Sequence, residues 1–188
     1  FIIDNPNLSI DWETEIRNYC QKVVVINDTP DRKYDCDIFL NHHYKKYIHQ
    51  KDDELIPENS SKLIGSEFAL LDPIYNTLQR KITHKKGRIN NILISFSGKD
   101  REGMTLKTLD AIVSLNREDI KINVFVNYNS PDFIKIQKKA NNFKNINLFN
   151  YQNNLIPFML KADYAFGGGD INVLERCCLG LPSTVIYL

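Results

Sequence analysis

The sequence has little of what marks a membrane protein, a disulfide-stabilised secreted domain or a nucleic-acid binder. It contains no apolar run long enough to span a membrane and no signal-peptide pattern. The formal net charge is only +1, so no strong field attracts nucleic acid or anionic lipid. Four cysteines show no CxxC spacing, and the adjacent pair Cys177 and Cys178 suits neither an internal disulfide nor a tetrahedral metal site. We expect a cytoplasmic monomer with reduced thiols, no metal ion and no other cofactor.

Two glycine signatures of nucleotide enzymes are also missing. Gly167 and Gly169 are followed by Asn172, where a dinucleotide fingerprint requires its third glycine. The run Ser97-Gly98-Lys99-Asp100 lacks the spacing of a Walker loop. These absences argue against a nicotinamide oxidoreductase and against phosphoryl transfer.

What is present fits a folded α/β protein. The apolar fraction of 43% and the charged fraction of 25% are typical of globular domains. A length of 188 residues accommodates one domain and part of another. We expect the remainder of a first Rossmann-like domain in residues 1–80, a polar linker in 81–90 and a nearly complete second domain in 91–188. The buried pattern of residues 1–4 has no preceding element, which indicates that the first domain is truncated.

Apolar runs alternate with amphipathic segments along both halves. In the first half the expected strands are 1–4, 23–26, 37–40 and 62–65, and helices begin after Ser9 and Asp72. In the second half the expected strands are 92–96, 120–126, 146–149, 162–166 and 183–187, and the expected helices are 104–115, 132–142, 155–161 and 171–179. Strands that alternate with helices at this spacing predict a doubly wound parallel sheet.

Five of the eight glycines gather in two predicted loops, each directly after a strand and before a helix. They are Gly98, Gly103, Gly167, Gly168 and Gly169. At the carboxyl ends of parallel strands glycine lets the backbone approach a phosphate, and the next helix offers unpaired N–H groups. The alternative is that glycine merely supplies a positive φ in the turn, although three consecutive glycines exceed that need. We therefore predict an anion site at both loops.

Glu175 lies about one turn inside the last predicted helix. A carboxylate there either stabilises the N-terminal half of the helix or accepts two hydrogen bonds from a ribose diol. Position along the chain does not separate these two roles.

Several segments resemble one family in its own order. Gly167–Ser183 reads GGGDINVLERCCLGLPS and is similar to the glycine-rich loop and the E-R-C-x-L-G-x-P-S segment of the nucleotide-sugar hydrolases of pseudaminic-acid biosynthesis. Residues 94–100 resemble their S-x-G-G-x-D loop. Cys36–Tyr44 resembles their C-D-x-x-L-x-x-x-Y segment, and Gly65–Leu71 resembles G-P-x-Y-A-L-L. The resemblance implies a fold of the glycosyltransferase-B type with two Rossmann-like domains.

The resemblance also implies a UDP-sugar substrate held by the second domain. The loops at 97–98 and 167–170 would contact the diphosphate, Glu175 the ribose, and the segment 149–151 the uracil. The complete set of implied nucleotide-binding residues is Ser97, Gly98, Phe149, Tyr151, Gly167, Gly168, Gly169, Asp170, Ile171, Asn172 and Glu175.

The implied reaction is hydrolysis of a UDP-linked amino or deoxy sugar to free sugar and UDP. In the family a histidine near the true N-terminus acts as the base, and we expect it upstream of Phe1, so the chain alone would be inactive. The histidines present are His42, His43, His49 and His84, and none has the matching context. Two alternatives stay open: an inverting UDP-sugar glycosyltransferase of the same fold for surface polysaccharide, and a non-catalytic nucleotide-sugar-binding module.

Overall fold

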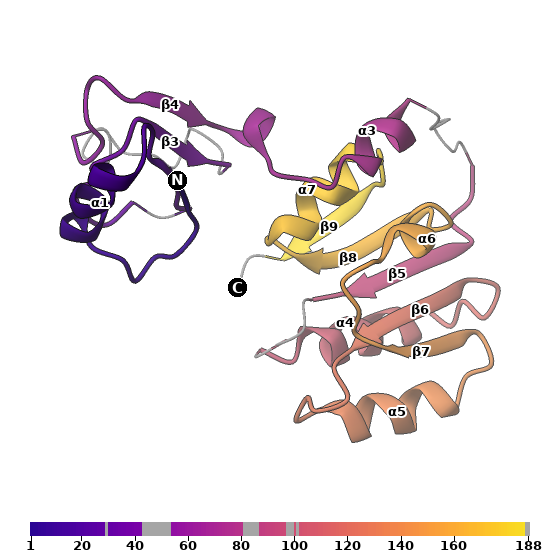
Figure 1. Cartoon of the computed structure of the whole chain (residues 1–188). Coiled ribbons are helices and arrows are strands. Elements are labelled where there is room, and N and C mark those ends of the chain that lie inside the picture. Colours follow the sequence, from indigo (N-terminus) through magenta and orange to yellow (C-terminus); the bar gives the residue numbers. More distant parts are fainter. Residues whose placement is uncertain (29, 43–53, 81–86, 97–99, 101, 187–188) are drawn as a thin grey trace. The chain divides into compact units, whose positions relative to one another are not determined.

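A computed structural model describes residues 1–28, 30–42, 54–80, 87–96, 100 and 102–186. The chain divides into two compact units, Phe1–Leu70 and Leu71–Leu188 (Figure 1). Each unit is built on its own sheet, and each is described by itself below. Among the described residues, no helix has the length and apolar character needed to cross a membrane.

The first unit is a parallel sheet of four strands in the order β1-β2-β3-β4. Its strands are β1 (Ile2–Ile3), β2 (Val24–Ile26), β3 (Ile38–Asn41) and β4 (Ser61–Ile64). Its helices are α1 (Ile10–Ile16) and the 3-10 turns η1 (Arg17–Tyr19) and η3 (Ser66–Phe68). The predicted strands of this half are confirmed, with ends shifted by at most one residue.

The core of the first unit lies between α1 and the sheet. Ile3, Val25 and Phe39 are buried on the sheet, and Trp12 and Ile16 of α1 pack against them. This burial of one helix stripe on one sheet face is the ordinary source of stability for such a layer. Tyr19, which the sequence places on the same stripe, instead ends η1 with its side chain largely exposed.

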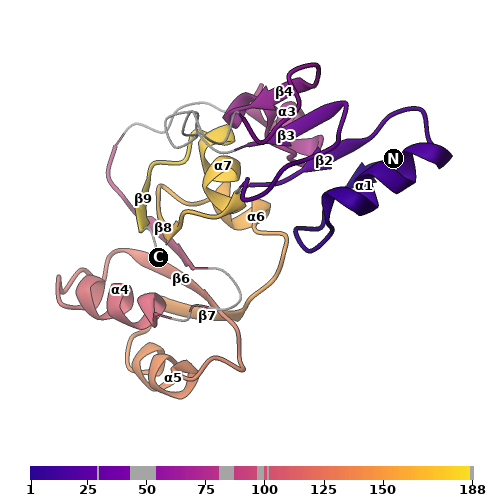
Figure 2. The ribbon, with the colours of Figure 1, turned by 90° about the vertical axis from the view of Figure 1, so that its left-hand side faces the viewer.

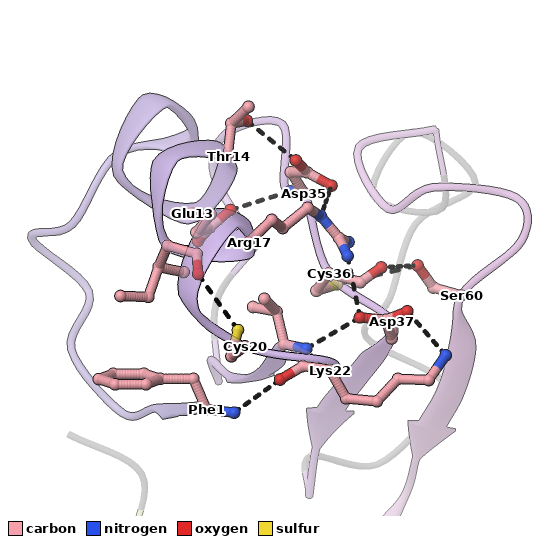
Figure 3. A network of polar contacts seen from close by, with 12 residues as sticks. Phe1, Glu13, Thr14, Arg17, Cys20, Lys22, Asp35, Cys36, Asp37 and Ser60 are labelled. Carbon is pink, nitrogen blue, oxygen red and sulfur yellow. Dashed lines mark hydrogen bonds and ion pairs between the residues drawn. The ribbon is translucent and has the colours of Figure 1, made fainter.

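A polar network ties α1 to the strands of the first unit (Figure 3). Arg17 bonds Asp35 through Nε (2.7 Å) and Asp37 through Nη1 (3.0 Å). Asp37 also accepts hydrogen bonds from the Val23 amide (2.8 Å) and from Lys22 Nζ (2.9 Å). Asp37 belongs to the C-D segment of the family resemblance, and the structure gives this carboxylate a role in stabilising the fold.

Glu13 is the buried member of this network. Its carboxylate is fully buried and accepts hydrogen bonds from Arg32 Nη2 (2.6 Å) and from the Asp35 amide (2.9 Å). The sequence places Glu13 only in the first turn of a helix and does not indicate its partners. A buried carboxylate with a cation and an amide as partners avoids the cost of an unpaired buried charge.

The second unit is a parallel sheet of five strands in the order β7-β6-β5-β8-β9. Its strands are β5 (Asn91–Ser95), β6 (Lys121–Val126), β7 (Ile146–Asn150), β8 (Tyr164–Gly168) and β9 (Ser183–Ile186). Its helices are α3 (Ile74–Gln79), α4 (Met104–Val113), α5 (Phe133–Asn141), α6 (Ile156–Met159) and α7 (Ile171–Cys178). All predicted elements of this half are therefore confirmed in type and order.

Helices cover both faces of the second sheet (Figure 2). On β5, Ile92 and Ile94 pack with α4 and α5, whereas Leu93 packs on the other side with α3, α6 and the end of α7. This alternation follows from the two-residue period of a strand. The result is a doubly wound α/β unit, as predicted.

The boundary between the units differs from the sequence-based expectation. Helix α3, expected in the first domain, packs in the second unit, because Tyr75 is buried in the core formed with α6 and α7. The unit boundary therefore falls between Leu70 and Leu71, ten residues earlier than position 80. Of the expected linker 81–90, residues 81–86 lie outside the described part of the chain.

Candidate functional site

The strand order of the second unit creates a switch point between β5 and β8. The chain runs outward from β5 to β6 and β7, and then returns to place β8 and β9 on the other side of β5. In open α/β sheets, ligands bind outside the carboxyl ends of the strands that flank such a point. Ser95 at the end of β5 pairs with Gly167 of β8, so the two predicted glycine-rich segments begin side by side.

The glycine triplet was predicted to lie in a loop, but most of it belongs to a strand. Gly167 and Gly168 are buried residues of β8, which pair with Val185 and Ile186 of β9, and only Gly169 lies beyond the strand. The predicted strand ends at Phe166, the last large apolar residue, and therefore leaves out both glycines. Among the described glycines, the positive φ angles belong to Gly65, Gly87, Gly103 and Gly180. Backbone conformation therefore does not explain the triplet.

Close packing explains one glycine of the triplet and leaves another unexplained. A Cβ on Gly167 would lie 2.4 Å from Nη1 of Arg176 and 2.7 Å from the carbonyl oxygen of Ser95. A Cβ on Gly168 would meet no atom within 4 Å. Gly167 is thus required by its neighbours, whereas Gly168 leaves space at the end of the strand, where a ligand could approach the backbone.

Arg176 places a buried positive charge beside this strand end. Its side chain is 1% exposed, and Nη2 donates a hydrogen bond to the carbonyl oxygen of Gly168 (3.0 Å). Its Nε has no hydrogen-bond partner among the described residues. Burial lowers the pKa of Arg176, and the charge of Asp170 opposes that shift. The sequence identified Arg176 only as a neighbour of Glu175 within the family-like segment.

Helix α7 begins at the switch point with Asp170 as its N-cap. The Asp170 carboxylate accepts hydrogen bonds from the amide of Asn172 (3.1 Å) and from its side-chain nitrogen (2.9 Å). This caps one of the unpaired amides of the first turn. Because the carboxylate also brings a negative charge to the helix N-terminus, it is better suited to accept from hydroxyl groups than to contact a phosphate.

Four polar side chains gather around the start of α7. Burial raises the pKa of Glu175, and a hydrogen bond with Tyr75 of α3 opposes that shift. Burial likewise raises the pKa of Tyr151, which follows β7, and a hydrogen bond with Asn172 opposes it. The charges of Asp170 and Glu175 also act on Tyr151. The structure therefore brings Tyr151, Asp170, Asn172 and Glu175 into one neighbourhood, as the sequence-based set requires.

Phe149 does not share this environment. Its ring stacks on Phe125 with centroids 5.1 Å apart and packs against Phe158 at 5.0 Å. These rings belong to the core between the sheet and α6. The structure gives Phe149 a packing role, and its contact with a base stays a prediction.

The other predicted diphosphate loop is only partly described. Ser97 and Gly98 lie outside the described residues. Asp100, the last residue of the family-like loop, is buried, and its carboxylate accepts hydrogen bonds from the amides of Met104 (2.8 Å) and Thr105 (3.0 Å). Asp100 therefore caps α4 and anchors the connection that leaves β5.

Of the histidines, the structure describes His42, which belongs to the first unit. Nδ1 of His42 lies 3.2 Å from Oδ1 of Asp28 in the first unit. His43, His49 and His84 lie outside the described residues. Cys20, Cys36, Cys177 and Cys178 are free thiols.

Comparisons with known proteins bear on the fold of the chain. No protein-family model matches the chain. It is 24% identical over 194 residues to the uncharacterized protein MJ1062 of Methanocaldococcus jannaschii, a match that covers 99% of this chain and 40% of that protein. It is 25% identical over 123 residues to the spore coat polysaccharide biosynthesis protein SpsG of Bacillus subtilis, covering 65% of this chain and 36% of that protein. MurG of Acinetobacter baumannii matches with a TM-score of 0.58 and 13% identity, over 94% of this chain and 48% of that one.

The chain thus spans less than half the length of each of these proteins. Neither curated relative is described as a hydrolase of pseudaminic-acid biosynthesis, so that resemblance stays a prediction. The likeness to MurG concerns the fold. With its two parallel α/β sheets, the chain has a fold of the glycosyltransferase-B type.

Proposed function

We propose that this chain supplies the nucleotide-binding part of an enzyme that acts on a UDP-linked sugar in the biosynthesis of a surface glycan. The observation that carries the proposal is the composition of the switch point in the second unit. A strand end with open space at Gly168, a buried Arg176 and the start of α7 adjoin an acidic and aromatic pair, Glu175 and Tyr151. The strand end with Arg176 and the start of α7 suits a phosphate, the carboxylate of Glu175 suits a ribose diol, and the ring of Tyr151 suits a base.

In this proposal each group of the nucleotide has its own contacts. Backbone amides at Gly168, Gly169 and Ile171 would bind the diphosphate, with Ser97 and Gly98 from the neighbouring loop. The charge of Arg176 would favour the anion without direct contact. Glu175 would accept hydrogen bonds from the ribose diol, and Tyr151 with Asn172 would adjoin the uracil.

Two reactions use such a site. In hydrolysis, a water oxygen bonds to the anomeric carbon, the bond from that carbon to the β-phosphate oxygen breaks, UDP leaves with the electron pair, and a general base takes the water proton. In glycosyl transfer, an acceptor hydroxyl replaces the water. The amides and Arg176 would stabilise the charge that develops on departing UDP in either reaction.

The family-like ERCCLGLPS run supports the hydrolase, whereas the name of SpsG and the fold shared with MurG support a polysaccharide-forming transferase equally well. The two separate on products, measured with the full-length protein and a panel of UDP-sugars. Free sugar and UDP formed without an acceptor indicate a hydrolase, and release that depends on an acceptor indicates a transferase. UDP binding without turnover of any sugar nucleotide would favour the non-catalytic module.

The nucleotide site itself is tested by calorimetry on residues 1–188. We expect UDP to bind, and Glu175→Gln to weaken that binding about tenfold, because hydrogen bonds to a charged acceptor contribute about 1.5–3 kcal/mol. Glu118→Gln is a matched control, because Glu118 is exposed on a connection remote in sequence from α7. Equal UDP affinity in all three proteins would show that Glu175 does not bind UDP. Failure of the unmodified chain to bind UDP would contradict the proposed function.

A further inference from the structure

Arg176 is a buried cation with few partners. Its side chain is 1% exposed, and Nη2 donates a hydrogen bond to the carbonyl oxygen of Gly168 (3.0 Å). Among the described residues, Nε has no hydrogen-bond partner, and no carboxylate forms an ion pair with the guanidinium. A buried charge without an ion pair is costly to the fold. Stability alone therefore gives no reason for an arginine at this position.

The hydrogen bond from Arg176 fixes the direction of one peptide group. The carbonyl of Gly168 and the amide of Gly169 belong to the same trans peptide, so the C=O and the N–H point in opposite directions. Because the carbonyl oxygen faces the buried guanidinium, the Gly169 N–H points away from it. Gly169 is exposed, and in the described part of the chain its N–H has no hydrogen-bond partner. This amide is available to a ligand at the carboxyl end of β8.

A peptide group between two glycines needs such a restraint. Neither Gly168 nor Gly169 has a Cβ, so the peptide that joins them can turn over at little steric cost. In the turned orientation the carbonyl oxygen would take the place of the N–H and would repel an anion. The hydrogen bond from Nη2 holds the orientation in which the donor is presented.

We propose that Arg176 is a positioning residue that presents the Gly169 amide to the diphosphate of the bound nucleotide. This inference rests on the proposed function. Arg176 acts from inside the protein, through the Gly168 carbonyl, and does not touch the ligand. The amide is set before the nucleotide arrives, so binding does not have to supply the free energy of orienting it.

Substitutions at position 176 separate the hydrogen bond from the charge. Arg176→Lys keeps the positive charge, but its Nζ stands where arginine has Cζ, one bond short of Nη2. Arg176→Met removes both the charge and the donors and keeps an unbranched chain. Arg117→Lys and Arg117→Met are the matched controls, because Arg117 forms an exposed ion pair with Asp119 in the connection that enters β6, away from the carboxyl ends of the strands.

The test compares UDP with uridine, which lacks the phosphates, by NMR titration of the 188-residue chain and its variants. In Arg176→Lys we expect the affinity for UDP to fall about three- to tenfold, the contribution of about one hydrogen bond, and the affinity for uridine to stay the same. Arg176→Met should lose more UDP affinity, because the charge is also gone, and both Arg117 variants should keep the UDP to uridine ratio. A general loss of structure would weaken both ligands alike, so a change in the ratio excludes a purely structural role.

The Gly169 amide supplies a second measurement. UDP, and inorganic pyrophosphate by itself, should shift the Gly169 amide proton resonance downfield in the unmodified chain, as a new hydrogen bond to a phosphate oxygen does. The shift should be smaller in Arg176→Lys, in which the peptide is no longer held.

The outcomes distinguish this inference from the proposed function. If the unmodified chain binds no UDP, the proposed function fails, and the role of Arg176 fails with it. If the chain binds UDP and the Gly169 resonance does not respond, only the positioning role is overturned, a result that needs no variant to fold. The same conclusion follows if Arg176→Lys keeps both the UDP to uridine ratio and the Gly169 response, because Arg176 would then act through its charge alone.

Discussion

At the residue scale, the first unit depends on one carboxylate whose charge is well compensated. The Val23 amide, Lys22 and Arg17 together lower the pKa of Asp37 to about 2 (Figure 3). The usual value for an aspartate is about 3.9. Because the folded-state pKa is depressed, ionised Asp37 stabilises the fold fully above that usual value, and the contribution is lost as the pH falls toward 2.

Replacing Asp37 with Asn should therefore destabilise the protein in a pH-dependent manner. We expect a loss of about 1–3 kcal/mol at pH 7, because the variant loses a charged acceptor of three hydrogen bonds. The difference from the unmodified chain should shrink between about pH 4 and pH 2, where the native carboxylate becomes protonated. Urea unfolding at several pH values measures both effects.

Asp119→Asn is the control for this prediction. Asp119 forms an exposed ion pair with Arg117, and such pairs contribute little to stability. A loss in Asp37→Asn that did not vary with pH would show that shape, rather than charge, makes Asp37 important.

Residue-scale contacts of this kind were the least predictable from the sequence. Glu13 and Arg176 are buried charged residues whose partners come from other elements or loops, namely Arg32 and Gly168. Local patterning identifies a charge on a helix but contains no information about what a different element will bring to it. By contrast, the cap that Asp170 forms at the start of α7 is a local interaction, of the kind that a sequence can indicate.

At the element scale, the contact of Gly167 with Arg176 joins strand β8 to helix α7. A side chain on Gly167 would collide with the guanidinium and with the backbone of β5, whereas the same change at Gly168 would meet nothing within 4 Å. Gly167 is therefore needed for packing, whereas Gly168 leaves room for a ligand.

We predict that alanine lowers stability at Gly167 and lowers UDP affinity at Gly168. Gly167→Ala should cost about 1–3 kcal/mol of unfolding free energy, which is typical of overpacking, since Arg176 must move from its buried position. Gly168→Ala should leave stability nearly unchanged and weaken UDP binding, because the methyl group fills the space beside the strand end. Thermal unfolding and calorimetry on both variants provide the comparison, and equal stability losses would contradict it.

The elements themselves were largely predictable. Strands and helices of the second unit follow from the two-residue and 3.6-residue periods. The switch point depends on the order of the strands in space, which the structure shows and the sequence does not contain. The end of β8 was wrong because a glycine carries no hydrophobic signal, although it can pair in a ladder as Gly167 and Gly168 do. The packing of Phe149 was not predictable, because position at a strand end does not reveal which side of the sheet a ring faces, and its contact with uracil stays a prediction.

At the scale of the whole molecule, the division into units differs from the expected one in the place of α3. The sequence placed α3 with the first domain, because a charged segment follows it at 81–90 and charge runs often mark linkers. Packing decides otherwise. Leu71, Tyr75 and Leu78 contact the core that contains Met159 and Leu179.

Two shortened chains test this assignment. Residues 71–188 should fold cooperatively, whereas residues 81–188 should be less stable by about 3–5 kcal/mol, because burial of each large apolar side chain contributes about 1.5–3 kcal/mol. The shorter chain also lacks Tyr75, which is buried in that core. Urea unfolding of the two chains measures the difference. If 81–188 matched 71–188 in stability, α3 would be dispensable to the second unit, and the boundary at Leu70 would not hold.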